Sequence, residues 1–396
     1  MNEFKKIVFD KEKILKVMES LQNAETKAFL ASPPRNPEND PRWNDYAAMW
    51  MRDQLFMADA YYYFGMYEKL VESVYPIFNI LHNQRHKLER ISHPRDKNGK
   101  FITSELIHAK YDAATLKELT CRNSVTGHEN PIEWGHHQLD AIGLFLHLVA
   151  DLNFKNIDAR RDENDKKILQ LLIFYLINVE YWQQPDFGMW EECLIKHASS
   201  IGAVVAGLSY IKRRDLATVP EELITFGQNQ LFRILPYESQ DVCEREHHKW
   251  ENSHDCDVAQ LFLIWPFNIV GLEMADLLLD RIINGHKAKN GKFHRLVQSF
   301  GIHRYWGDDY YRDKNGVSAQ WQWDFLISII YSQRHQYETA FEWFKRGASR
   351  ITDDGHIAEA YVDGKPNDHT PLGWMHALAL IAFRKLPIQT QKTLLP

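Results

Sequence analysis

Segments with helical periodicity recur along the chain of 396 residues, with long loops between them, and no other feature restricts its possible folds so strongly. Apolar residues recur at intervals of three and four over residues 11–30, 43–64 and 67–86, and again toward the C-terminus. Few segments show the alternation of apolar and polar residues that is typical of half-buried strands. The sequence therefore predicts an all-α protein.

The expected helices follow one another in pairs that long loops connect. Beyond the first three, the periodicity predicts helices at 138–152, 164–182, 199–212, 220–234, 268–284, 318–333, 337–350 and 373–385. Length alone would suggest two or three domains. The chain has no Gly/Ser-rich linker and no shift of composition, however, so about twelve paired helices favour one closed α/α toroid.

The composition excludes several classes of partner. The net charge is −6 and there is no long basic block, so we expect neither nucleic acid nor an anionic membrane as a partner. No window approaches the ~18 apolar residues of a membrane helix, and the N-terminus lacks an apolar segment of signal-peptide length. We expect a cytoplasmic protein whose four cysteines do not form a disulfide framework. The sequence sets no expectation for the oligomeric state.

A loop between two of the expected helices carries a pair of adjacent carboxylates. Glu191 and Glu192 follow Trp190, and Gly188 lets the chain turn sharply just before them. Loops that a rigid scaffold positions are common places for catalytic groups. The meaning of this pair depends on whether the chain supplies a second carboxylate and an aromatic sugar site.

Two other motifs could supply part of such a site. The run Trp50-Met51-Arg52-Asp53 places an Arg and an Asp beside a Trp, where they could bind sugar hydroxyls or form a surface ion pair. Trp134 precedes a glycine at a helix entrance, where it could stack on a sugar or close the helix end onto the core.

The second half of the chain adds two more candidates. Arg304 lies in a loop at 303–311 that is rich in aromatic and charged residues. Glu359 lies in a loop ahead of the last helix, which carries Trp374, although a solvated glutamate is the simpler interpretation.

No metal or other cofactor is expected. The segment 243–257 mixes Cys, His and Asp, but its spacing fits none of the common zinc patterns. His136 and His137 are adjacent, so they would point in different directions on a helix.

Together these residues match the requirements of glycoside hydrolysis. That reaction needs two carboxyl groups across the scissile bond, one protonated and one ionised. It also needs aromatic faces and hydrogen-bond donors that hold the sugar ring. Glu191 and Glu359 are the candidate pair, and the Trp and Arg residues lie on several loops.

As an ordered set, the motifs resemble glycoside hydrolase family 15, the glucoamylase family. The resemblance covers roughly residues 40–385 and rests on Trp50-Met51-Arg52-Asp53, Trp134-Gly135, Gly188-Met189-Trp190-Glu191-Glu192, Arg304-Tyr305 with Asp308/Asp309-Tyr310-Tyr311, and Glu359 ahead of Trp374. It implies an (α/α)6 barrel that forms one catalytic domain over 1–396. Residues 1–40 would be an N-terminal helix and loop packed on that barrel.

The resemblance also implies a role for each residue. Glu191 is expected to be the general acid, and Glu359 the general base that activates water. The other residues are expected to bind substrate: Trp50, Arg52, Asp53, Trp134, Trp190, Glu192, Arg304 and Trp374. Members of the family invert at the anomeric carbon, which predicts a gap of about 6.5–9.5 Å between the two carboxyl groups. Packing against Trp190 and closeness to Glu192 would raise the pKa of the acid.

The expected substrate is small, such as maltose, isomaltose or a short oligosaccharide, because no starch-binding module or signal sequence is evident. The flanks of Glu191 and the stretch around Trp134 also resemble the domain of phosphorylase kinase α and β subunits. A sugar-binding or regulatory protein without turnover is therefore the alternative. A third hypothesis is a toroid epimerase or lyase, in which His136, His137 and His197 would line the pocket.

Overall fold

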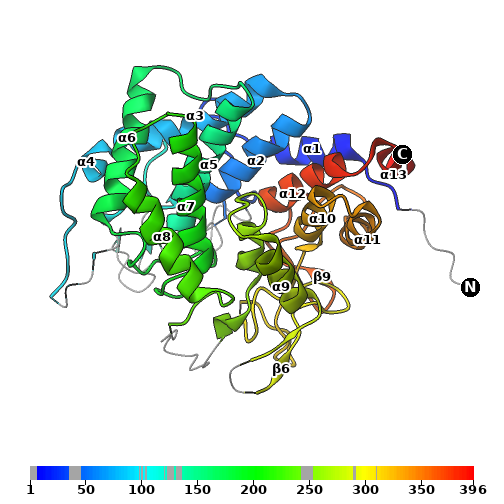
Figure 1. Cartoon of the computed structure of the whole chain (residues 1–396). Helices are drawn as coiled ribbons and strands as arrows, with labels where there is room; N and C mark the ends of the chain where they lie inside the picture. Colours follow the sequence, from blue (N-terminus) through cyan, green and yellow to red (C-terminus); the bar gives the residue numbers. More distant parts are fainter. Residues whose placement is uncertain are drawn as a thin grey trace, which may run out of the picture.

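Paired helices are the main regular structure of the chain in the computed structural model (Figure 1). The structure describes residues 7–34, 46–97, 99, 101–102, 105–119, 121–122, 129–130, 136–241, 253–288, 291–308 and 310–396. The described helices form an inner and an outer ring, which is the expected (α/α)6 barrel. Within these residues, no helix has both the length and the apolar character that crossing a membrane requires.

The inner ring consists of elements that are buried on almost all sides. In the last of them, every residue from Gly373 to Phe383 is buried, which a helix tolerates only in the interior of a protein. The inner elements are α2 (Met51–Tyr63), α5 (Leu139–Phe154), α7 (Ala198–Arg213), the 3-10 helix η4 (Val258–Leu263), α10 (Asp324–Gln333) and α12 (Gly373–Lys385).

Contacts between neighbours close the inner ring. Helix α2 touches α5, α5 touches α7, α7 touches η4, α10 touches α12, and α12 returns to α2. The remaining junction is aromatic, because Phe262 of η4 meets Trp323, just before α10, edge to face with 6.2 Å between ring centroids.

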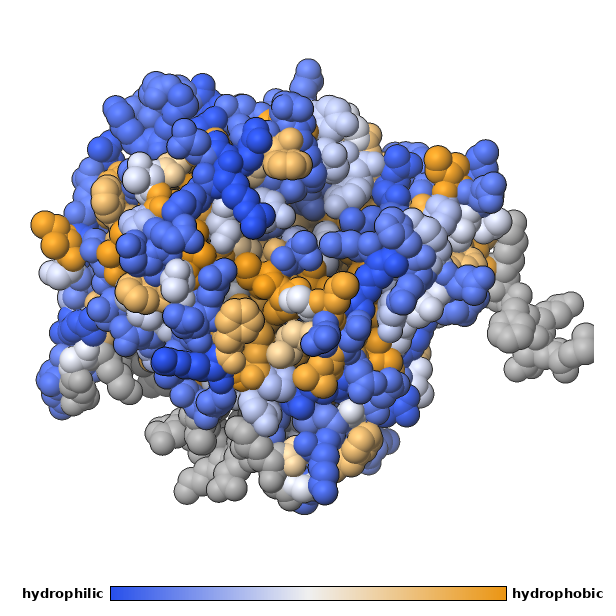
Figure 2. Space-filling model, in the orientation of Figure 1, coloured by the Kyte–Doolittle hydropathy of each residue, from blue (hydrophilic) through white to orange (hydrophobic). Residues whose placement is uncertain are grey.

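The outer ring consists of amphipathic helices. Helix α9, for example, buries Ala275, Leu278, Leu279 and Ile282, which form one stripe at helical spacing. Figure 2 shows the result on one face of the molecule, where polar residues cover most of the surface and apolar ones gather near its middle. The outer helices are α1 (Lys11–Ser20), α3 (Tyr67–Asn83), α6 (Glu163–Asn178), α8 (Glu221–Ile234), α9 (Leu272–Ile283) and α11 (Tyr337–Ala348).

Short elements complete the described part of the chain. The helical ones are α4 (Arg85–Leu88), η3 (Ser253–Asp255) and α13 (Ile388–Leu394). The strands, all antiparallel, pair as β1 (Met49–Trp50) with β2 (Lys110–Tyr111), β3 (Cys121–Arg122) with β4 (Glu129–Asn130), β5 (His286–Lys287) with β6 (Phe293–His294), and β7 (Gln320–Trp321) with β8 (Ala360–Val362) and β9 (Lys365–Pro366).

Several expected boundaries differ from the structure for physical reasons. The first helix ends at Ser20 rather than near residue 30, because Oδ1 of Asn23 accepts the backbone N–H groups of Glu25 and Thr26 and turns the chain. The expected helices at 43–64 and 318–333 begin only at Met51 and Asp324, because strands precede them. Periodicity missed η4, which is too short to show a helical repeat.

The residues before most inner elements are extended, and they all enter the ring from one end. Trp50, Gln138, His197, Asp257 and Leu372 have extended backbone angles and are followed directly by helical residues. These N-terminal ends favour negative charge, because the first N–H groups of a helix lack intrahelical partners. This end of the barrel is therefore suited to hold carboxylates.

Helices α5 and α7 approach each other unusually closely through glycines. A Cβ atom on Gly143 would lie 2.4 Å from the backbone carbon of Ala203, and one on Gly207 would lie 2.6 Å from the carbonyl oxygen of Gly143. Backbone atoms cannot move aside as side-chain ends can, so these positions require glycine.

Gly143→Ala is expected to lower the free energy of unfolding by about 2–3 kcal/mol, because it overpacks a backbone contact. Urea titration followed by circular dichroism would measure the change. Gly271→Ser is the control: no atom lies within 4 Å of a Cβ there, and Ser is a favoured N-cap for α9. Equal stability of the two variants would contradict the close-packing interpretation.

Candidate active site

A pocket lies at the end of the barrel where the inner helices begin. It contains every sequence-predicted site residue that the structure describes, except Glu192. Its predicted lining residues are Trp50, Arg52, Asp53, Trp190, Glu191, Arg304, Glu359 and Trp374. Side chains separated by more than 300 positions in the sequence therefore meet in one cavity.

Two of the predicted site residues, Trp134 and Glu192, are not among the described pocket-lining residues. Trp134 lies outside the described residues, so its expected stacking role stays a prediction. Glu192 does not line the pocket: its side chain is only 7% exposed, and both of its oxygens accept hydrogen bonds from the protein.

The segment that carries Glu191 is a closed loop, here called the acid loop and defined as residues 186–195. Its neck is a backbone pair in which the N–H of Asp186 donates to the carbonyl of Ile195 and the reverse bond forms as well, at 3.0 and 3.1 Å. Asp186 also accepts the N–H of Leu139 and the hydroxyl of Ser200, at 2.9 and 2.8 Å. The loop is therefore fastened at its base to both α5 and α7.

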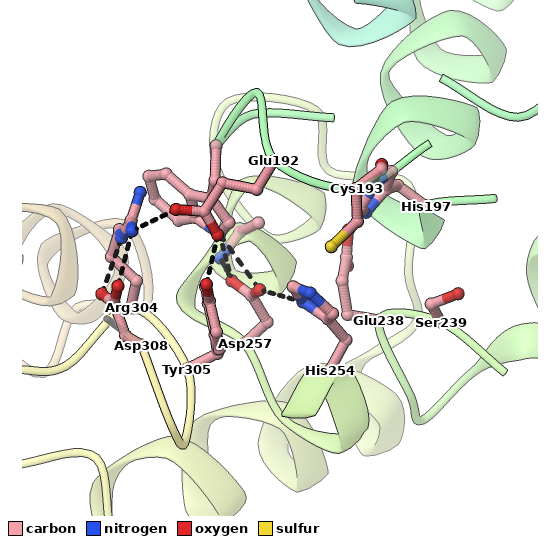
Figure 3. A network of polar contacts seen from close by, with 12 residues as sticks. Glu192, Cys193, His197, Glu238, Ser239, His254, Asp257, Arg304, Tyr305 and Asp308 are labelled. Carbon is pink, nitrogen blue, oxygen red and sulfur yellow. Dashed lines mark hydrogen bonds and ion pairs between the residues drawn. The ribbon is translucent and has the colours of Figure 1, made fainter. Parts of the chain in front are cut away.

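Three consecutive side chains of the acid loop are held by three different parts of the chain. Trp190 Nε1 donates to both carboxylate oxygens of Asp257, at 2.9 and 3.0 Å. Glu191 Oε1 accepts from Arg52 of α2, at 3.1 Å. Glu192 accepts from Arg304 at 2.6 Å and from the hydroxyl of Tyr305 (Figure 3). Glu192 is thus an anchor of the loop that leaves Glu191 facing the pocket.

The backbone of the acid loop is left-handed at two positions. Gly188 and Glu191 both have φ near +60°. For Glu191 this conformation is uncommon in a residue with a Cβ atom. Such a backbone persists where the surroundings determine it strongly, and the anchors on either side of Glu191 supply that determination.

Burial dominates the protonation of Glu191. Removal of the carboxyl group from water raises its pKa to about 8, although the cations Arg52 and Lys110 oppose that rise. The neighbouring carboxylate that adds to the rise is Asp53, whereas the sequence suggested Glu192. Glu191 therefore carries a proton at neutral pH and can donate it.

Glu359 sits in a different environment. Its two oxygens accept hydrogen bonds from the hydroxyl of Tyr46 at 2.5 Å and from Asn367 Nδ2 at 2.6 Å. Tyr310 in turn donates to the hydroxyl of Tyr46 at 3.1 Å. Burial raises the pKa of Glu359 to about 7, and the hydrogen bonds from Tyr46 and Asn367, which favour the anion, limit the rise. Glu359 is therefore the more acidic of the two carboxyl groups.

The β8–β9 hairpin places Asn367 beside Glu359. The backbone N–H of Asn367 donates to the carbonyl of Ala360 at 2.8 Å, one residue after Glu359. The side chain of Asn367 can then reach back to the carboxylate.

Arg304 is held rigidly against the pocket wall. Its Nε and Nη2 donate to the two oxygens of Asp308 at 2.7 and 2.6 Å. Its guanidinium lies over the rings of Trp321 and Tyr310, 4.8 and 5.0 Å from their centroids. Within the described residues, Nη1 makes no hydrogen bond to the protein and is available to a ligand.

Among the described residues, no histidine lines the pocket. His197 lies behind the acid loop, with Nδ1 at 3.4 Å from Glu238 and Nε2 at 3.2 Å from the carbonyl of Cys193. Burial lowers the pKa of His197, but the hydrogen bond to Glu238 and the charges of Asp186 and Glu238 raise it to about 9. His197 is thus a buried cation that supports the loop. His136 and His137 are likewise absent from the pocket lining, so a histidine base, as an epimerase or lyase of this shape would need, has no candidate among the described lining residues.

The cysteines and possible metal ligands give two further results. Cys193, at the end of the acid loop, is disulfide-bonded, which the cysteine count did not suggest. Across the described ranges, no group of three or more His, Cys, Asp or Glu residues could hold a metal ion. Most of the mixed segment 243–257 lies outside those ranges.

Several lining residues are not among those predicted from the sequence: Tyr46, Met189, Tyr310, Trp321 and Leu372. Tyr310 stood within a motif that was singled out for Arg304. Trp321 belongs to a Gln-Trp-Gln-Trp run that could have indicated an aromatic wall. Tyr46 carried no signal beyond its position four residues before Trp50.

Comparison with known proteins identifies a family that covers most of the chain. The model of the family described as "Glycosyl hydrolases family 15" matches residues 11–384. A similar curated protein is the mouse (Mus musculus) phosphorylase b kinase regulatory subunit alpha, liver isoform, with 28% identity over 49% of this chain. The match spans only 17% of that much longer relative.

Solved structures with a similar fold include glycosidases. A glycosidase variant in complex with glucose superimposes with a TM-score of 0.71 at 17% identity, over 95% of this chain and 96% of the other. A bacterial glucoamylase complexed with acarbose gives a TM-score of 0.58 at 15% identity, over 96% of this chain and 56% of the other. At these identities the likeness establishes the fold.

Gly188→Ala is expected to lower the free energy of unfolding by about 3 kcal/mol or more. A Cβ atom there would meet the buried ring of His197 at 2.7 Å, in addition to the cost of a left-handed backbone. Gly316→Ala is the matched control, since Gly316 has φ +78° but no atom within 4 Å of a Cβ. If the two variants lose the same stability in thermal unfolding, His197 does not support the loop as described.

Proposed function

Because this chain belongs to glycosyl hydrolases family 15, we propose that its pocket is the active site of an inverting, exo-acting glycosidase. The enzyme releases glucose from the non-reducing end of small α-glucosides or oligosaccharides. One observation carries this proposal: two carboxyl groups, the partly buried Glu191 and the buried Glu359, face the same pocket, and hydrogen bonds from Tyr46 and Asn367 favour the anion of Glu359.

The two environments assign the roles. Glu191, whose pKa is about 8, is the general acid that protonates the oxygen of the leaving sugar. Glu359, whose pKa is about 7, is the general base that takes a proton from water as the water attacks the anomeric carbon. Attack from the side of Glu359, opposite the leaving group, inverts the configuration. This mechanism requires a gap of about 6.5–9.5 Å between the carboxyl groups, so that water fits.

The rest of the pocket suits one glucose ring. Trp50, Trp190 and Trp374 offer apolar faces for the ring, and Nη1 of Arg304 is available to a hydroxyl group. Asp53 lies in the first turn of α2. Burial raises its pKa to about 6, whereas Arg52 and the backbone N–H groups of Asp53 and Trp374 favour its anion, which would accept from sugar hydroxyls. Glucose in one structural neighbour and acarbose in another support a sugar as the ligand.

Similarity to phosphorylase kinase α subunits favours a second candidate, a sugar-binding or regulatory protein without turnover. In such a protein the pocket would bind sugar, but Glu191 and Glu359 would have no catalytic duty. The presence of both carboxyl groups in one pocket favours hydrolysis over this alternative.

The test of the function is incubation with maltose, isomaltose, trehalose and maltotriose, with enzymatic detection of free glucose. We expect release of glucose from at least one α-glucoside. Binding of maltose in calorimetry without any release would support the regulatory candidate and contradict hydrolysis.

Glu191→Gln is expected to lower kcat by about 10²–10⁴-fold, because the amide cannot protonate the leaving oxygen. Gln keeps the size of the side chain and can still accept from Arg52, so the melting temperature should change little. Glu222→Gln, at an exposed position on α8, is the control. Activity within a factor of three of the wild type in Glu191→Gln would remove Glu191 as the acid.

The pH dependence of kcat/KM is expected to be a bell with its maximum between about 7 and 8. Glu359 must be ionised, so the rate falls as the pH drops below about 7. Glu191 must be protonated, so the rate falls as the pH rises above about 8. Initial rates measured in steps from about pH 5 to about pH 10 would locate both limbs. A maximum at about pH 5 would mean that the pocket does not raise the two pKa values as inferred.

A further inference from the structure

The guanidinium of Arg52 joins the acid to the barrel with both of its terminal nitrogens. Nη2 donates to Glu191 Oε1 at 3.1 Å and to the carbonyl of Met189 at 2.7 Å. Nη1 donates to Gln138 at 3.1 Å and to Asp140 Oδ2 at 2.7 Å. Arg52 is only 4% exposed, so protein groups rather than water satisfy this fork.

Asp140 is the carboxylate at the far end of that fork. It lies in the first turn of α5, where a helix favours negative charge, and it is 2% exposed. Its Oδ1 has no hydrogen-bond partner among the described residues. Its one ion pair within that part of the chain is with Arg52, at 2.7 Å. Asp140 is absent from the pocket lining, so it does not reach a substrate.

The pairing of Arg52 with Asp140 explains how Glu191 can accept a hydrogen bond from a guanidinium and still keep its proton. A lone guanidinium at hydrogen-bond distance lowers the pKa of a carboxyl group by about 1–3 units, and an ionised Glu191 could not act as an acid. A guanidinium that is already paired with a closer carboxylate attracts a second one much less. Arg52 can then orient Glu191 without removing its proton.

We propose that Asp140 controls the protonation of Glu191 from outside the pocket, by neutralising the guanidinium of Arg52 that bridges the two carboxyl groups. Asp140 is thus a positioning residue that acts through Arg52. This inference rests on the proposed role of Glu191 as the general acid.

Other charged groups near Glu191 do not replace Asp140. Asp53 of α2 raises the pKa of Glu191, whereas Lys110 of β2 and Arg304 lower it, and none of the three bonds to Arg52 in the described residues. Tyr46 also faces Glu191 but is neutral at ordinary pH, because its pKa is raised further by burial. On the side of α5, Asp186 lies near Asp140 and makes the electrostatic potential there more negative.

The experiment is an NMR titration of the protein labelled with 13C at the side-chain carboxyl of glutamate. The signal of Glu191 is identified by its absence in Glu191→Gln. In Asp140→Asn we expect its pKa to fall by about 1–2 units, since Arg52 becomes an unpaired cation. If the enzyme is active, the alkaline limb of kcat/KM should move to lower pH by the same amount.

Two controls separate this effect from general damage. Asp165→Asn removes a carboxylate of α6 that is equally buried and pairs with Arg161, so it should leave the Glu191 titration unchanged. Asp140→Glu keeps the negative charge, so the pKa of Glu191 in this variant should stay close to its value in the wild type.

A double-mutant cycle tests the route through Arg52. Arg52→Gln should raise the pKa of Glu191, because it removes a cation. Adding Asp140→Asn to that variant should produce no further change, and this pair of variants also remains informative if Asp140→Asn alone does not fold. An unchanged pKa in Asp140→Asn, or a further fall in the double variant, would overturn the proposal.

The titration does not need turnover. If the protein hydrolyses no glycoside but Asp140→Asn lowers the pKa of Glu191, the coupling holds and the proposed function fails. If hydrolysis occurs and the pKa does not move, only the coupling fails.

Discussion

Glu191 lies 3.1 Å from a guanidinium and still has a pKa of about 8, and the rest of the site depends on this combination. Burial is the larger effect, because a carboxylate loses more by leaving water than it gains from a cation that is already shared. The barrel supplies the burial through aromatic walls that come from distant parts of the chain. A more open pocket would let Arg52 ionise Glu191, and the distinction between acid and base would disappear.

The fold supports this chemistry by placing extended residues directly before the inner helices that carry pocket residues. Each inner helix that carries a pocket residue begins just after an extended residue, so side chains such as Trp50 and Arg52 stand at the mouth of the ring. The acid loop is then fastened from three sides, through Trp190, Glu191 and Glu192. Rigid support of this kind lets a catalytic group keep its geometry during the reaction.

Much of this arrangement could be predicted from the sequence. Helical periodicity is local, so it revealed most of the paired helices, and the ordered motifs brought Arg52, Glu191, Arg304 and Glu359 together. Elements that depend on tertiary pairing were missed, such as β1 and β7, which shorten two expected helices. The anchoring role of Glu192 could not be predicted from its position beside Glu191, because its partner Arg304 lies 112 positions away in the sequence.

The stereochemistry of the released glucose tests the central assignment most directly. Proton NMR spectra recorded during the first minutes of hydrolysis of an α-glucoside separate the two anomers before they interconvert. The proposed roles, in which Glu359 activates water opposite the sugar oxygen that Glu191 protonates, predict that β-glucose appears first. Initial appearance of α-glucose would show retention and would contradict the roles assigned to both carboxyl groups.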